Sequence, residues 1–236
     1  MKDLWNLRTF RNDLSKLIEV IEIEKVTGDF SELQKLLVII DQKERVEYKI
    51  ENLCFFINGK IKGTLPEQIN YYQVYFDIMV MIKEELNINS DPLGCYNLDI
   101  TVKGYENKST LKKDYSSRWH LDKHNNEGST KYTHPIYHFQ FGGKKMELID
   151  TELSVLSSPR IPHPPMDIFL GFHFIISNFF NAKQFSFVNS LLANYEYLQI
   201  IKRAQVRLWK PYFGAFDPLS THTDFTMNNV FPLYIN

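Results

Sequence analysis

Two runs of alternating apolar and polar residues lie near the middle of the chain, at residues 118–124 and 134–143. Read with a side-chain period of two, each run has one apolar face. The apolar residues are Trp119 and Leu121 in the first run and Tyr137, Phe139 and Phe141 in the second. Residues 125–131 between the runs are polar and include a glycine, as suits a loop. The pattern predicts a two-stranded antiparallel hairpin.

The opposite face of this hairpin carries the polar side chains. They are His120, Asp122 and His124 on the first strand and His134, His138 and Gln140 on the second, together with Ile136. If His124 pairs with His134, His120 lies opposite His138 and Asp122 lies opposite Ile136. A slip of one residue would turn the histidines into the core, so burial of the aromatic face is expected to fix the register. Four histidines and one carboxylate would then share a surface.

The N-terminal apolar pattern has helical spacing. Between Leu7 and Ile21 the apolar residues recur at steps of three and four, which predicts an amphipathic helix. Residues 31–40 predict a second, shorter helix that folds back on it. We therefore expect a helical hairpin over residues 1–43 and an α+β domain over residues 44–236. The two parts could also form one continuous domain.

The rest of the chain predicts a mixture of strands and helices. The expected strands are a hairpin or strand pair at 47–61, one strand at 97–105 and one at 146–156. The expected helices are 64–82, begun by Thr64 and Pro66, then an apolar helix at 168–180 and an amphipathic helix from 188 that Pro211 ends. A proline-rich connector at 157–167 and a C-terminal strap complete the chain. The predicted fold class is α+β: an antiparallel sheet of about five strands flanked by helices.

Composition narrows the function only slightly. Lys and Arg number 27 against 28 Asp and Glu, so net charge favours neither nucleic acid nor membrane. Residues 103–145 are locally basic, with nine Lys and Arg against four acids. The two cysteines form no disulfide framework, which favours a reducing compartment. No secretory signal is visible and no apolar run reaches the roughly twenty residues that span a bilayer, so we expect a cytoplasmic protein.

The histidine face suggests three kinds of site. The first is a divalent transition metal, because imidazole and carboxylate are common metal ligands. The candidate ligands are His120, Asp122, His124 and His138. The simpler alternative is a polar outer strand face with no ligand.

The second kind of site is catalytic without a metal. His120 and His138 would transfer protons during RNA cleavage, because both protonation states of histidine exist near neutral pH. Arg118 or Lys123 would stabilise the negative charge of the transition state.

The third kind of site binds without chemistry. A basic, aromatic sheet face suits a nucleic-acid backbone, with Trp119, Tyr115 or Tyr132 stacking on a base, or it suits a partner protein. The candidate binding residues are Trp119, Lys123, His134, Arg160 and His163.

A set of short motifs carries a resemblance to a known family. In order they are His134-Pro135, His138, Gly142-Gly143, Arg160-Ile161-Pro162 and Pro164-Pro165, then an apolar helix ending in Asn178-Phe179-Phe180. This order resembles an uncharacterised bacterial family encoded beside helicases in phage-defence loci. The resemblance implies a cytoplasmic bacterial protein that works with a larger partner such as an ATPase or helicase, and it assigns no catalytic residues.

The sequence therefore predicts an accessory or effector subunit of an anti-phage defence assembly. It would bind nucleic acid or a partner protein through the face that carries His120 and His138. The alternative is a phosphodiester-cleaving nuclease that uses the same two histidines, with or without a metal.

Overall fold

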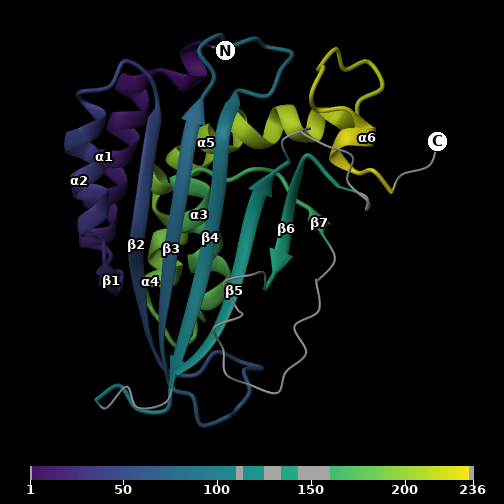
Figure 1. Cartoon of the computed structure of the whole chain (residues 1–236). Coiled ribbons are helices and arrows are strands. Elements are labelled where there is room, and N and C mark those ends of the chain that lie inside the picture. Colours follow the sequence, from purple (N-terminus) through teal and green to yellow (C-terminus); the bar gives the residue numbers. More distant parts are fainter. Residues whose placement is uncertain (1, 110–113, 125–133, 143–159, 234–236) are drawn as a thin grey trace.

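The computed structural model describes residues 2–109, 114–124, 134–142 and 160–233. Within these ranges the strands form one antiparallel sheet of seven strands, arranged in sequence order from β1 to β7. Helices α3, α4 and α5 cover one face of the sheet, and α1 and α2 lie beside strand β2 near the β1 edge (Figure 1). The α+β class and the antiparallel sheet are confirmed, and the sheet has more strands than the five expected.

The element bounds are as follows. The strands are β1 (Gly28–Asp29), β2 (Glu47–Asn58), β3 (Tyr71–Ile82), β4 (Leu93–Tyr105), β5 (Asp114–Lys123), β6 (Tyr137–Phe141) and β7 (Ile161–Pro162). The helices are α1 (Leu7–Ile23), α2 (Ser31–Ile40), α3 (Ile168–Phe179), α4 (Phe187–Ala193), α5 (Tyr195–Phe213) and α6 (Met227–Val230). The 3₁₀ turns η1 (Lys2–Trp5) and η3 (Gly214–Phe216) precede α1 and follow α5. None of the helices described has both the length and the apolar character needed to cross a membrane.

The core lies between the inner face of the sheet and the helices. Helix α3 is buried on nearly all sides, as its apolar sequence predicts. Its Phe172 ring lies 5.1 Å from the ring of Phe55 on β2. A Cβ added at Gly171 would lie 2.3 Å from Cζ of Phe76 on β3, so the glycine allows α3 to approach the sheet closely.

The predicted helix at 64–82 is wrong, because residues 71–82 form β3. Its inner residues are Tyr72, Val74, Phe76, Ile78, Val80 and Ile82, which alternate strictly. Tyr75 and Met79 on the outer face are also apolar, so helical spacing fits the same residues. The strand pair expected at 47–61 is the single strand β2, which pairs along its length with β3.

Other segments differ in detail from the sequence-based expectation. The helix expected from residue 188 is two helices, α4 and α5, because Asn194 ends the first and its side chain caps the second at Tyr197 N. Pro211 lies within the last turn of α5 and does not end it. The strand expected at 146–156 and the whole of the loop at 125–131 lie outside the described residues.

Helices α1 and α2 form where the N-terminal pattern predicts them. The link between them contains β1, which pairs antiparallel with β2. The N-terminal helical hairpin as a separate unit is therefore not confirmed, and the domain division at residue 43 stays a prediction. One cluster of buried side chains includes Leu14 of α1, Leu36 of α2 and Phe169 of α3.

Candidate metal centre

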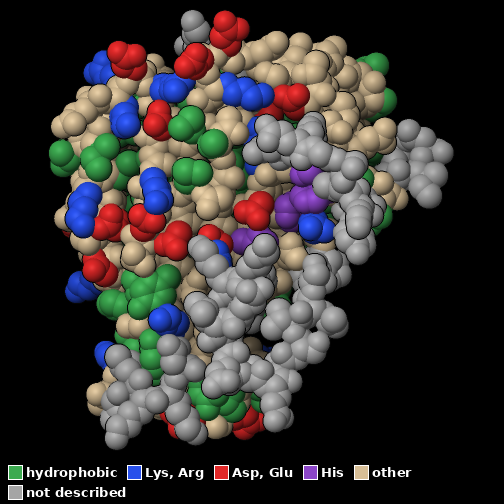
Figure 2. All heavy atoms as spheres, in the orientation of Figure 1, with side chains coloured by type: hydrophobic (Ala, Val, Ile, Leu, Met, Phe, Trp, Pro, Cys, Tyr) green, Lys and Arg blue, Asp and Glu red, His purple; other side chains and the backbone are tan. Residues whose placement is uncertain are grey.

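A pocket of about 630 Å³ lies on the outer face of β4, β5 and β6, opposite the helices. Polar side chains of these three strands line it, together with His134 before β6 and Arg160 before β7. Figure 2 shows histidines gathered at this place beside acidic side chains. The strict alternation of β5 and β6 explains the gathering, because every second side chain points away from the core.

The register of the hairpin differs by two residues from the one predicted. Asp122 pairs with His138, and His120 pairs with Gln140. A shift of two keeps every side chain on its predicted face, because the side-chain period of a strand is two. The prediction that His120 and His138 share the outer face is therefore confirmed, and the prediction that they pair directly is wrong.

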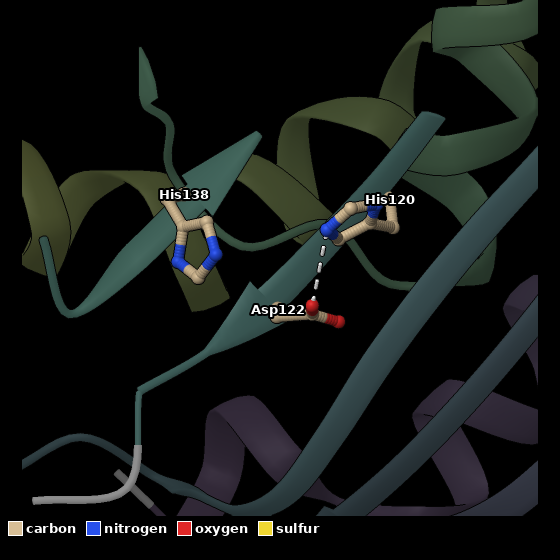
Figure 3. A group of neighbouring side chains, drawn as sticks. All are labelled: His120, Asp122 and His138. Atoms are coloured by element: carbon tan, nitrogen blue, oxygen red, sulfur yellow. Dashed lines mark ion pairs between the residues drawn. The ribbon is translucent and has the colours of Figure 1, made fainter. Parts of the chain in front are cut away.

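Three predicted ligands converge in this pocket. One ligand atom from each of His120, Asp122 and His138 lies within 4.8 Å of the other two. Nε2 of His120 lies 3.4 Å from Oδ2 of Asp122. Figure 3 shows both rings and the carboxylate around a common space, with His120 and Asp122 on β5 and His138 on β6. We call these three residues the triad.

His138 is the most buried member of the triad, with 4% of its surface exposed. Burial, together with the nearby charges of His134 and Arg160, lowers the pKa of this imidazole from 6.5 to about 3. Its Nδ1 is buried without a hydrogen-bond partner among the described residues. An unsatisfied buried nitrogen typically costs about 1–3 kcal/mol. His138 is thus a neutral imidazole at physiological pH, the form that binds metals.

Two histidines and one carboxylate suit a divalent transition metal such as Zn²⁺, Mn²⁺ or Fe²⁺. Metal bonds of about 2.1 Å limit two ligands of one ion to about 4.2 Å apart. The 4.8 Å spread of the triad atoms is slightly larger, so binding would draw the side chains together by small rotations. Three protein ligands leave coordination positions open to water or substrate, as in catalytic centres.

His124, the fourth predicted ligand, does not join the triad. Its ring packs on His134 with centroids 4.0 Å apart. The ring of His134 lies in turn 4.4 Å from that of His138. Burial lowers the pKa of His134, and the charge of His124 adds to the effect. His134 thus packs directly on His138, whereas His124 packs on His134.

Two of the predicted cations have acidic partners. Arg118 donates from Nε to Oδ1 of Asp99 at 3.1 Å, and both side chains are largely buried. Nζ of Lys123 lies 2.9 Å from Oδ2 of the buried Asp91. The pocket is therefore less positive than the count of Lys and Arg implies. The alternation of residues 97–105 already placed Asp99 on the outer face, whereas no local pattern indicated Asp91.

Trp119 and His163, two of the predicted binding residues, lie on the inner face of the sheet. Trp119 stacks on Phe139 with centroids 5.5 Å apart, as expected of two residues on the apolar face of the hairpin. The ring of His163 lies 5.4 Å from Phe139, and its Nδ1 is 2.7 Å from the Pro164 carbonyl oxygen. Both side chains thus pack against the core side and do not line the pocket.

Comparisons with known proteins identified no relative of this chain. No family model, curated protein or solved structure matches the chain. The interpretation of the pocket therefore depends on its own geometry and chemistry.

Proposed function

We propose that this protein is a metal-dependent hydrolase that cleaves phosphodiesters. A divalent transition metal would be held by His120, Asp122 and His138. The observation that carries the proposal is the convergence of these three ligand groups, within 4.8 Å, in one pocket. Polar side chains on an ordinary sheet face usually point apart into solvent. Here two adjacent strands bring three ligand groups together, which is the arrangement of a metal site.

The low pKa of His138 favours this mechanism over metal-free acid and base catalysis. An efficient general acid or base has a pKa near the working pH. At a pKa of about 3, His138 would almost never carry the proton that a metal-free mechanism asks it to donate. The same neutral ring needs no deprotonation before it binds a metal.

Each part of the pocket would then have a role. The metal, when bound, would activate water and polarise a phosphoryl oxygen. The chain's own residues would hold the substrate: Arg160 by charge, and Asn97 and Gln140 by their amide groups, since all three line the pocket. Arg118 lines the same pocket, with its guanidinium held by the Asp99 carboxylate on the neighbouring strand.

Turnover of a small phosphodiester tests the proposal. Bis(p-nitrophenyl) phosphate is incubated with purified protein and Zn²⁺, Mn²⁺ or Fe²⁺ in turn. We expect metal-dependent release of p-nitrophenol that the His120→Ala, His138→Ala double variant abolishes while its circular dichroism is unchanged. His124→Gln, a change to a pocket histidine outside the triad, is the matched control. Wild-type protein inactive with every metal, or an active double variant, would refute the proposal.

A subunit of a bacterial defence assembly is the second candidate function. The outer face of the sheet favours it, because the pocket there is lined by polar and charged side chains that could contact a nucleic acid or a larger partner such as a helicase. The cytoplasmic location of the protein stays a prediction. Under this function the same double variant would lose a complex, and wild-type protein would show no turnover.

A further inference from the structure

Arg160 differs from the other cations of the pocket. Arg118 and Lys123 have Asp99 and Asp91 as partners, whereas Arg160 has no ion pair with any described residue. Its Nε is buried without an acceptor among the same residues. A guanidinium carries only donors, so this N–H requires an oxygen or another acceptor that the described pocket does not supply.

The backbone places Arg160 beside the triad. Strand β7 pairs with β6 through Ile161 with Phe139 and Pro162 with His138. One step back along this register puts Arg160 at the level of Gln140, on the outer face with Pro162. The positive charge of Arg160 also contributes to the lowered pKa values of His134 and His138, as expected of a close neighbour.

We propose that Arg160 receives a phosphoryl oxygen of the substrate, and that the substrate is a small, nucleotide-sized phosphodiester. This inference rests on the proposed function of the pocket. A guanidinium fork binds phosphate oxygens through two parallel hydrogen bonds, and a buried Nε is one arm of such a fork. The anion would then lie between Arg160 and the metal.

The size and charge of the pocket support a small substrate. Pockets for small ligands measure about 300–1,000 Å³, and this one measures about 630 Å³. Binding to a long nucleic acid requires cations that contact several phosphates in a row. Among the described residues of the pocket, Arg118 and Lys123 are already paired, and the one unpaired guanidinium, that of Arg160, matches one phosphate.

Binding of inorganic phosphate to the full chain tests the role of Arg160. Isothermal titration calorimetry is performed without metal, so that the result does not depend on the hydrolase proposal. We expect Arg160→Gln to weaken phosphate binding about 10- to 100-fold, the effect of losing a charge-assisted pair of hydrogen bonds. Arg160→Lys should fall between wild type and Arg160→Gln, because an ammonium keeps the charge without the fork.

Lys103→Gln is the matched control, since Lys103 lies on the outer face of β4 and does not line the pocket. Its phosphate affinity should stay within about twofold of wild type. No binding by wild type, or equal losses in Arg160→Gln and Lys103→Gln, would overturn the inference. So would loss of metal by Arg160→Gln, because Arg160 would then be a positioning residue for His138.

A second titration tests substrate size. A dinucleotide and a twenty-nucleotide single strand are compared at two salt concentrations. We expect similar affinities for both. Much tighter binding of the long strand, with a steep salt dependence, would indicate a polynucleotide substrate and overturn the size assignment.

Discussion

The buried carboxylate of Asp91 contacts both strands that hold the proposed metal site, and its loss is expected to weaken this region. Its carboxylate is 1% exposed, accepts a hydrogen bond of 2.6 Å from the Tyr137 hydroxyl and lies 2.9 Å from Nζ of Lys123. Lys123 follows Asp122 in the chain, and Tyr137 precedes His138. One buried carboxylate therefore connects the two strands that carry the triad.

Asp91→Asn removes the charge and leaves Lys123 as a largely buried ammonium without a counter-charge. Breaking a buried ion pair in this way costs about 3–5 kcal/mol. For a chain of this size, 1 kcal/mol shifts Tm by about 2–4 °C, so we expect a decrease of about 6–20 °C. The double variant Asp91→Asn, Lys123→Met should recover much of the loss, because it removes both members of the pair.

Thermal and urea unfolding followed by circular dichroism measure these changes. Glu51→Gln is the control, since Glu51 pairs with Lys49 at 2.7 Å but both side chains are more than half exposed. Exposed pairs contribute about 0–1 kcal/mol, so this variant should unfold almost as wild type does. The role of the buried ion pair would be refuted by either of two results. One is an Asp91→Asn unfolding free energy within about 1 kcal/mol of wild type, and the other is a double variant less stable than Asp91→Asn alone.

Two further changes follow from the packing and the pKa of the site. Because the pKa of His138 is about 3 in the folded chain and near 6.5 when unfolded, metal-free protein should lose about 2 kcal/mol as the pH falls from 7 to 5. His138→Asn should lose less over the same range, and urea titrations at both pH values decide between the two outcomes. Gly171→Ala should cost about 1–3 kcal/mol, because its Cβ would overlap the Phe76 ring; an unchanged urea midpoint would show that α3 can move away.

The polar face of the hairpin could be predicted because alternation alone determines which side chains share a face. Trp119 and Phe139 stack on the inner side, and His120 and His138 face the pocket, as their positions indicate. Alternation does not determine register to better than two residues, since a shift of two preserves both faces. Sequence reasoning therefore identified the members of the triad but paired His120 with the wrong partner.

The remaining differences have physical causes in long-range contacts. Strand β3 has apolar residues on both faces, so its sequence fits the period of a helix as well as that of a strand. Strands β1 and β7 have two residues each, which is too short to show any periodicity. The pairing of Lys123 with Asp91 joins residues on different strands and loops, which no local pattern encodes. Such contacts determine which cations of the pocket remain available to a ligand. Among the described cations that line the pocket, only Arg160 has no acidic partner.

Metal stoichiometry tests the central claim most directly. Purified chain is dialysed against Zn²⁺ or Mn²⁺, freed of excess metal and analysed by atomic emission, beside Asp122→Asn, His138→Asn and the control His124→Gln. We expect one ion per chain in wild type and in the control, and little or none in the two triad variants. Wild-type protein without metal, or triad variants that keep a full complement, would contradict it.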